Sequence, residues 1–256
     1  YLYVAFDMDA GVEKGLHRST DAGVNWSANL ATTFVESQYD VCLLFPALGT
    51  GDGNDCWAIY HDSSANAVTL KLWDSSAGSE VESATIASVT GSTTDLVGQY
   101  PFSASIRQSD SHLILATMSA YDSGTDHKVF DITSTSTFTE KTAIASATDD
   151  HYYPQVYINQ SDDSIYVAYN GKRDGSETLG TTTKIYYTKS TDGGANWTAG
   201  DTAYMEGVAN AFVQVFAVPT GPRFYVGWRR GNILAGNAVN SVPASAVSVA
   251  ATGNAS

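Results

Sequence analysis

The sequence predicts an all-β protein, a β-propeller built from four-stranded antiparallel blades. Its composition is one of strands and turns: only 16% of the 256 residues are charged, and Tyr outnumbers Phe by 15 to 9. Apolar residues alternate in short runs, as at Val156 and Ile158, and clusters of Gly, Asp, Asn and Ser separate these runs. No window shows the apolar stripe of an amphipathic helix, so the elements are expected to be strands.

Internal repeats give the length of the structural unit. Tyr100 opens the segment YPFSASIRQSDSHLILATMS, and Tyr153 opens the similar segment YPQVYINQSDDSIYVAYN 53 residues later. Each segment predicts a strand, a Gln-Ser-Asp turn and a second strand, and weaker copies begin at Tyr39 and near Ala211. A unit of about 50–60 residues with four short strands is typical of a propeller blade.

A second repeat has the same period. The octapeptide STDAGVNW at 19–26 matches STDGGANW at 190–197, 171 residues later, which is three units of 57. In such a turn the Ser and Asp side chains bond the loop backbone, and Gly permits a positive φ. The pattern S-x-D-x-G-x-x-W resembles the Asp-box, or BNR repeat, of sialidases and related β-propellers. The resemblance implies a structural role for eight residues: Ser19, Asp21, Gly23, Trp26, Ser190, Asp192, Gly194 and Trp197.

The blade template divides one propeller domain, 1–256, into five units. The expected blades are 1–36, which lacks its inner strand, then 37–93, 94–147, 148–206 and 207–256. Sialidase-type propellers are six-bladed, so the partial first blade and the absence of an initiator Met favour further blades upstream of Tyr1. The alternative is a five-bladed ring in which a tail strand near 246–250 completes the first blade.

One end of each blade gathers groups suited to ligand binding. In an up-and-down blade, the loops between blades and the loops between second and third strands share one face. Carboxylates, aromatic rings and arginines fall on that face, and these groups recognise sugars and acidic sugars. The candidate ligand-binding residues are Tyr100, His151, Tyr152, Arg173, Arg229 and Arg230.

Charge excludes some partners. The net charge is −14 and the pI is about 4.5, which disfavours nucleic acid and anionic membrane surfaces. No apolar run is long enough to span a bilayer, so no membrane insertion is expected. The expected partners are a glycan or neighbouring protein subunits, and the expected location is extracellular, secreted or on a virus particle surface.

The sialidase resemblance implies a reaction that these residues do not support. That chemistry uses three arginines around a carboxylate, a Tyr nucleophile with a Glu, and an acidic Asp. The family's Phe/Tyr-Arg-Ile-Pro motif does not occur, and Ile106 precedes Arg107 without Ile-Pro after it. No catalytic residue is therefore assigned. The sequence predicts a non-catalytic module for binding or assembly, with a sialidase-type exo-glycosidase lacking its N-terminal part as the alternative.

Cofactor and redox signals are weak. No metal site or cofactor is predicted, although the acidic turns at 52–55 and 122–126 offer oxygen ligands of the kind that calcium uses. Cys42 and Cys56 lie on neighbouring predicted strands. They form either a cross-strand disulfide or two buried thiols.

Overall fold

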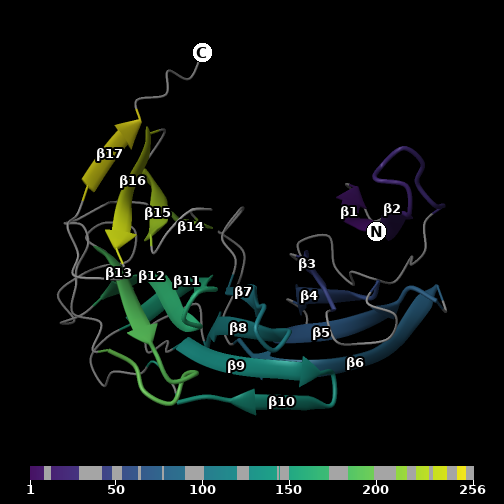
Figure 1. Ribbon diagram of the computed structural model, residues 1–256, viewed down its shortest axis with the longest axis horizontal. Coiled ribbons are helices and arrows are strands. Elements are labelled where there is room, and N and C mark those ends of the chain that lie inside the picture. The colour runs from purple at the N-terminus through teal and green to yellow at the C-terminus, as the bar shows by residue number, and fades with distance from the viewer. Residues whose placement is uncertain are drawn as a thin grey trace. The chain divides into compact units, whose positions relative to one another are not determined.

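The computed structural model describes residues 1–8, 13–28, 42–47, 54–62, 65–76, 78–89, 101–119, 127–142, 144, 150–172, 184–198, 212–217, 223–230, 233–240 and 247–251. These residues form seventeen strands in five antiparallel sheets (Figure 1). Contacts divide the chain into two compact units, residues 1–94 with 132–138 and residues 95–131 with 139–256. No helix among the described residues is long and apolar enough to cross a membrane.

The first unit holds two sheets. A hairpin pairs β1 (Leu2–Met8) with β2 (Glu13–Ser19). The second sheet has the order β3-β4-β5-β6, so each strand pairs with its neighbour in the chain. Its strands are β3 (Cys42–Pro46), β4 (Cys56–Asp62), β5 (Ala67–Asp74) and β6 (Ser79–Ser88).

The remaining sheets have the same meander order. The sheet β7-β8-β9-β10 consists of β7 (Phe102–Arg107), β8 (His112–Met118), β9 (His127–Ser134) and β10 (Thr137–Glu140). The described part of the next sheet has three strands, β11 (Asp150–Asn159), β12 (Ser164–Lys172) and β13 (Lys184–Ser190). The last sheet consists of β14 (Phe212–Ala217), β15 (Arg223–Arg230), β16 (Ile233–Asn240) and β17 (Val247–Ala251). The predicted four-stranded antiparallel sheets are thus confirmed.

The last strand, β17, does not pair with the first sheet, as the five-bladed alternative required. β17 pairs with β16, with Ala235 opposite Ala250 and Gly236 opposite Val249. The prediction that a strand near 246–250 completes the first blade is therefore wrong. The short residues of the tail complete the sheet to which they are joined in the chain.

A cross-strand disulfide is also excluded. Cys42 lies opposite Tyr60, and Cys56 lies opposite Pro46, four residues further along β3. Four residues of strand span about 13 Å, whereas a disulfide needs Cα atoms within about 7 Å. Cys56 is a buried free thiol, and the side chain of Cys42 lies outside the described residues.

In the second unit, the first strands of two sheets lie side by side. The Val156 backbone N–H donates to Ser103 Oγ at 3.2 Å, which joins β11 to β7. Just after β11, the Gln160 side chain donates to the Ile106 carbonyl at 2.8 Å and accepts from the Gln108 backbone N–H at 2.9 Å. Partner numbers rise together and differ by 52–54. The strands therefore run parallel, and the repeat offset of the sequence is their register in space.

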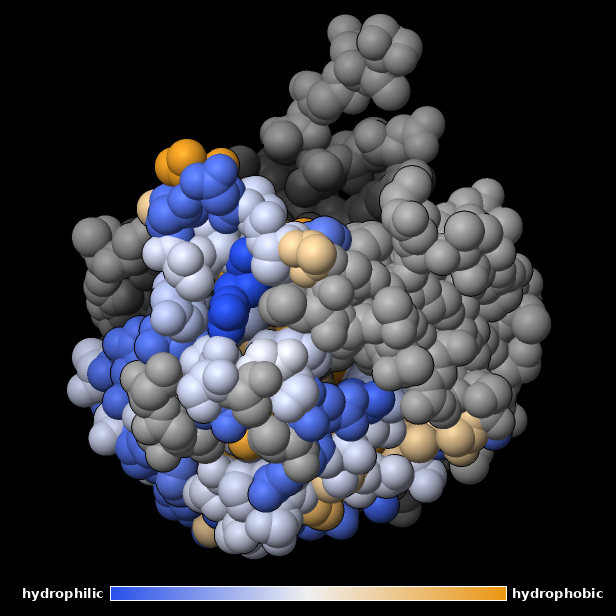
Figure 2. Space-filling view, turned by 90° about the vertical axis from the view of Figure 1, so that its right-hand side faces the viewer, coloured by the Kyte–Doolittle hydropathy of each residue, from blue (hydrophilic) through white to orange (hydrophobic). Residues whose placement is uncertain are grey.

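Each unit has its own apolar core. In the second unit, branched side chains from β8, β9, β11 and β12 form one cluster, with Trp197 packed against it. In the first unit, Leu16, Cys56, Ala58 and Trp73 form the buried cluster. Where the described residues form the surface drawn in Figure 2, it is mostly hydrophilic, with hydrophobic residues in small separate places.

The two octapeptide turns have the same hydrogen bonds. In each, Ser Oγ donates to Asp Oδ1 at 2.8 Å and accepts from the Gly N–H at 2.8 Å, for Ser19 and for Ser190. The Asp carboxylate accepts from the Asn backbone at 2.9 Å and from its side-chain amide at 2.7 Å. Gly23 and Gly194 both have φ of +91°, a conformation that side chains rarely adopt. The sequence motif thus encodes one turn geometry twice.

The two tryptophans pack differently, although they hold the same position in the octapeptide. Trp197 packs against the core of the second unit and donates from Nε1 to the Thr142 carbonyl at 2.8 Å. Trp26 is 43% exposed and donates to Gly23 of its own turn at 3.1 Å. The octapeptide fixes the turn, but the neighbouring segment decides where the indole packs.

This difference predicts unequal costs of truncation. Trp197→Ala should lower the free energy of unfolding by on the order of 3 kcal/mol, because it removes ring packing and a hydrogen bond. Trp26→Ala should cost less, on the order of 1 kcal/mol, because the residue is 43% exposed and its hydrogen bond stays within its own turn. Urea unfolding of both variants checks this, and equal losses would contradict the packing described.

The turns also predict an acid-sensitive contribution to stability. The Asn25 backbone N–H, followed by its side-chain amide and the Ser19 hydroxyl, lowers the pKa of Asp21 from 3.8 to about 2. The Asn196 side-chain amide, followed by its backbone N–H, does the same for the pKa of Asp192. Because the pKa of each Asp is lower in the folded state, ionisation of these carboxylates stabilises the fold above pH 3.8. That contribution is lost as the pH falls through about 2.

The measurement is urea unfolding at about pH 5 and about pH 2.5. Between these values the wild type should lose more stability than the double variant Asp21→Asn with Asp192→Asn, which has no carboxylate to protonate in either turn. Parallel losses in the two proteins would show that these carboxylates do not contribute.

Candidate functional site

Four of the six candidate ligand-binding residues lie in described strands. His151 and Tyr152 lie at the beginning of β11, opposite Gly171 and Asn170 of β12. Arg229 and Arg230 are the last residues of β15, opposite Leu234 and Ile233 of β16. Tyr100 and Arg173 lie outside the described residues. Each described candidate therefore lies where a first strand begins or a second strand ends, which is the end of the blade that the sequence predicted.

The beginning of β11 is irregular in a specific way. The pairing with β12 shifts between Tyr152 and Gln155, and Tyr153 between them has φ of +54° and is 4% exposed. A left-handed conformation costs a residue with a Cβ about 1–2 kcal/mol. Pro154 follows and has no N–H to give to the ladder. Bulges of this kind redirect the neighbouring side chains and are frequent beside binding sites.

Buried aromatic rings support this end of the second unit. His127, at the beginning of β9, is fully buried and meets the Tyr169 ring edge-on, with centroids 5.1 Å apart. Tyr169 of β12 stacks on Tyr186 of β13 at 5.7 Å. Tyr169 and Tyr186 are 4% and 2% exposed. Because they are buried, these rings are not themselves surfaces for a ligand.

The opposite end of the second unit carries an ion network. Asp131 in β9 lies between three basic side chains: Arg107 Nη2 at 2.9 Å, His112 Nδ1 at 2.6 Å and Lys141 Nζ at 3.3 Å. Arg107 also bonds Asp110 in the turn between β7 and β8, with Nη2 and Oδ2 2.6 Å apart. The side chains of Arg107 and Asp131 are each 10% exposed. The network therefore joins a turn to the third strand of the same sheet.

Burial and charge compete in this network. Burial alone would raise the pKa of Asp131, but hydrogen bonding and the positive charge of Arg107, with His112, hold that pKa below its usual value. Burial likewise opposes ionisation of Asp110, and Arg107 lowers its pKa. Both carboxylates are therefore ionised and paired at neutral pH. They hold the fold together and are poorly placed to act as an acid or base.

Neither Asp131 nor the buried rings were predicted from the sequence. Asp131 stands within a strand among apolar residues, so only the fold shows that Arg107, His112 and Lys141 meet it. The sequence does hint at an aromatic ring at Tyr169. The segments LYVAF at 2–6 and IYVAY at 165–169 are similar, and they align Tyr169 with Phe6.

Metal ligation finds no support in the described part of the chain. Among those residues, no group of three or more His, Cys, Asp or Glu side chains could hold an ion. At the turn 52–55, the Asn54 carbonyl accepts from Tyr3 Oη at 2.6 Å, and the Asp55 carboxylate accepts from the Ser75 N–H at 3.0 Å. The turn 122–126 lies outside the described residues.

Comparison with solved structures identifies the fold. An α-L-arabinanase from Penicillium chrysogenum, complexed with arabinobiose, shares 15% identity with a TM-score of 0.52, over 78% of this chain and 64% of that one. A thermostable family-43 glycoside hydrolase shares 10% identity with a TM-score of 0.50, over 80% and 71%. The fold is a β-propeller.

These similarities carry the fold alone, and this chain spans 64% of the length of the arabinanase. Family-43 glycoside hydrolases are five-bladed β-propellers. No family model matches the sequence, and no curated protein matches it. The specific resemblance to sialidases therefore stays a prediction based on the two octapeptides.

The ion network yields a stability prediction. Asp131→Asn should lower the free energy of unfolding by on the order of 3 kcal/mol, because it leaves the buried Arg107 guanidinium short of a partner. The matched control is Glu140→Gln, which removes the exposed partner of Lys128 at 3.9 Å and should cost less than about 1 kcal/mol. Thermal unfolding at neutral pH measures both, and a control as costly as Asp131→Asn would contradict the role of burial.

Proposed function

We propose that this propeller binds a glycan, without cleaving it, at the end where β11 begins. The observation that carries the proposal is the bulge at Tyr153, where a buried aromatic residue with positive φ directly follows His151 and Tyr152. A strained backbone is retained when the rest of the fold holds it, and such positions cluster at binding and active sites. Positive φ also occurs at the opposite end, at Ser111 and Asp163, but there it lies in the turns between strands, whereas at Tyr153 it coincides with a register shift inside a strand.

The residue types at this end suit a sugar. Tyr and His offer a flat apolar face and a polar edge, and Arg at the end of β15 can form paired hydrogen bonds with a carboxylate or with hydroxyls. β14 contacts both β11 and β12, so the sheet that carries Arg229 and Arg230 adjoins the sheet that carries His151 and Tyr152. Support also comes from the fold, because both similar structures are enzymes of carbohydrates, and one of them contains arabinobiose.

The non-catalytic part of the proposal rests on the missing arginine motif and on the paired state of the described carboxylates. Asp110 and Asp131 are held by Arg107, and Asp21 and Asp192 are held by their own turns. An exo-glycosidase is the second candidate, because the similar structures are an arabinanase and a glycoside hydrolase. Binding and turnover assays on one preparation separate the two.

The test is a glycan array that includes arabinan, galactan and sialylated oligosaccharides, followed by titration of any ligand found. His151→Ala with Tyr152→Ala should weaken binding at least about tenfold, which corresponds to roughly 1.4 kcal/mol. Thr191→Ala changes an exposed residue at the opposite end of the sheet and should leave affinity unchanged. Equal melting temperatures must accompany the comparison.

Turnover is measured with a fluorogenic sialoside and with aryl arabinosides and galactosides. No release above buffer, together with binding that the double variant loses, supports the proposal. Hydrolysis that is lost on Arg173→Ala would overturn the non-catalytic assignment. Binding that survives the double variant would remove the site from this end.

A further inference from the structure

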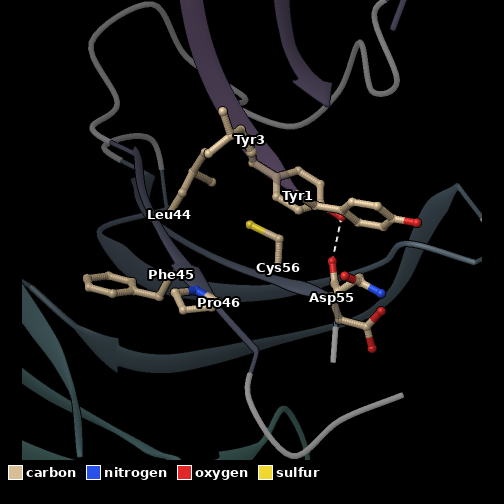
Figure 3. Close-up of a pocket in the computed structure, with 9 residues that line it drawn as sticks. Tyr1, Tyr3, Leu44, Phe45, Pro46, Asp55 and Cys56 are labelled. Carbon is tan, nitrogen blue, oxygen red and sulfur yellow. Dashed lines mark hydrogen bonds between the residues drawn. The ribbon is translucent and has the colours of Figure 1, made fainter. Parts of the chain in front are cut away.

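We draw no further inference here: the strongest candidate, the groove of about 260 Å³ between the beginning of β1, the end of β3 and the beginning of β4, where Figure 3 shows the Cys56 thiol between Tyr3 and Pro46, borders segments outside the described residues, and nothing in the structure shows what covers it.

Discussion

The burial of β12 on both of its faces is the constraint on which the second unit depends. Five successive residues, Ile165–Tyr169, are each at most 4% exposed. Side chains of a strand alternate between the two faces of a sheet, so one apolar layer could cover only every second residue. A run that is apolar throughout therefore requires neighbours on both faces. Radially arranged sheets supply them, and this is why the repeat of the sequence becomes the side-by-side register of β7 and β11.

The two ends of the second unit are stabilised by different interactions. At the end with the Gln-Ser-Asp turns, charges are paired, and Gln160 joins one sheet to the backbone of the next. At the other end, Tyr169 and Tyr186 stack on each other, and the backbone has positive φ at Tyr153. Paired charges tolerate little change, because removing one leaves another buried and unpaired.

Local features were predictable from the sequence, and features that depend on a neighbour were not. The octapeptide turns follow from Ser, Asp and Gly at fixed spacing, since each hydrogen bond is made within five residues. The strand pairs follow from alternation and from the Gln-Ser-Asp turns. The exposure of Trp26, the partners of Asp131 and the separation of Cys42 from Cys56 depend on which segment lies alongside, and the sequence pattern carries no signal for that. The blade template predicted that His151 and Arg229 lie at strand ends, but it could not indicate the bulge that follows Tyr152 in β11.

The difference between local features and features that depend on neighbouring segments also explains the low sequence identity with similar structures. A propeller needs apolar strands at regular spacing and turns of suitable geometry, and many sequences meet these requirements, so 15% identity is compatible with a shared fold. The residues that would contact a ligand lie on connections whose sequence the fold does not constrain. The similar structures therefore inform the fold of this chain and not its chemistry. In this chain the proposed place is the end of β11 where the backbone has positive φ at Tyr153, and the chemistry of any contact would come from the side chains beside that bulge.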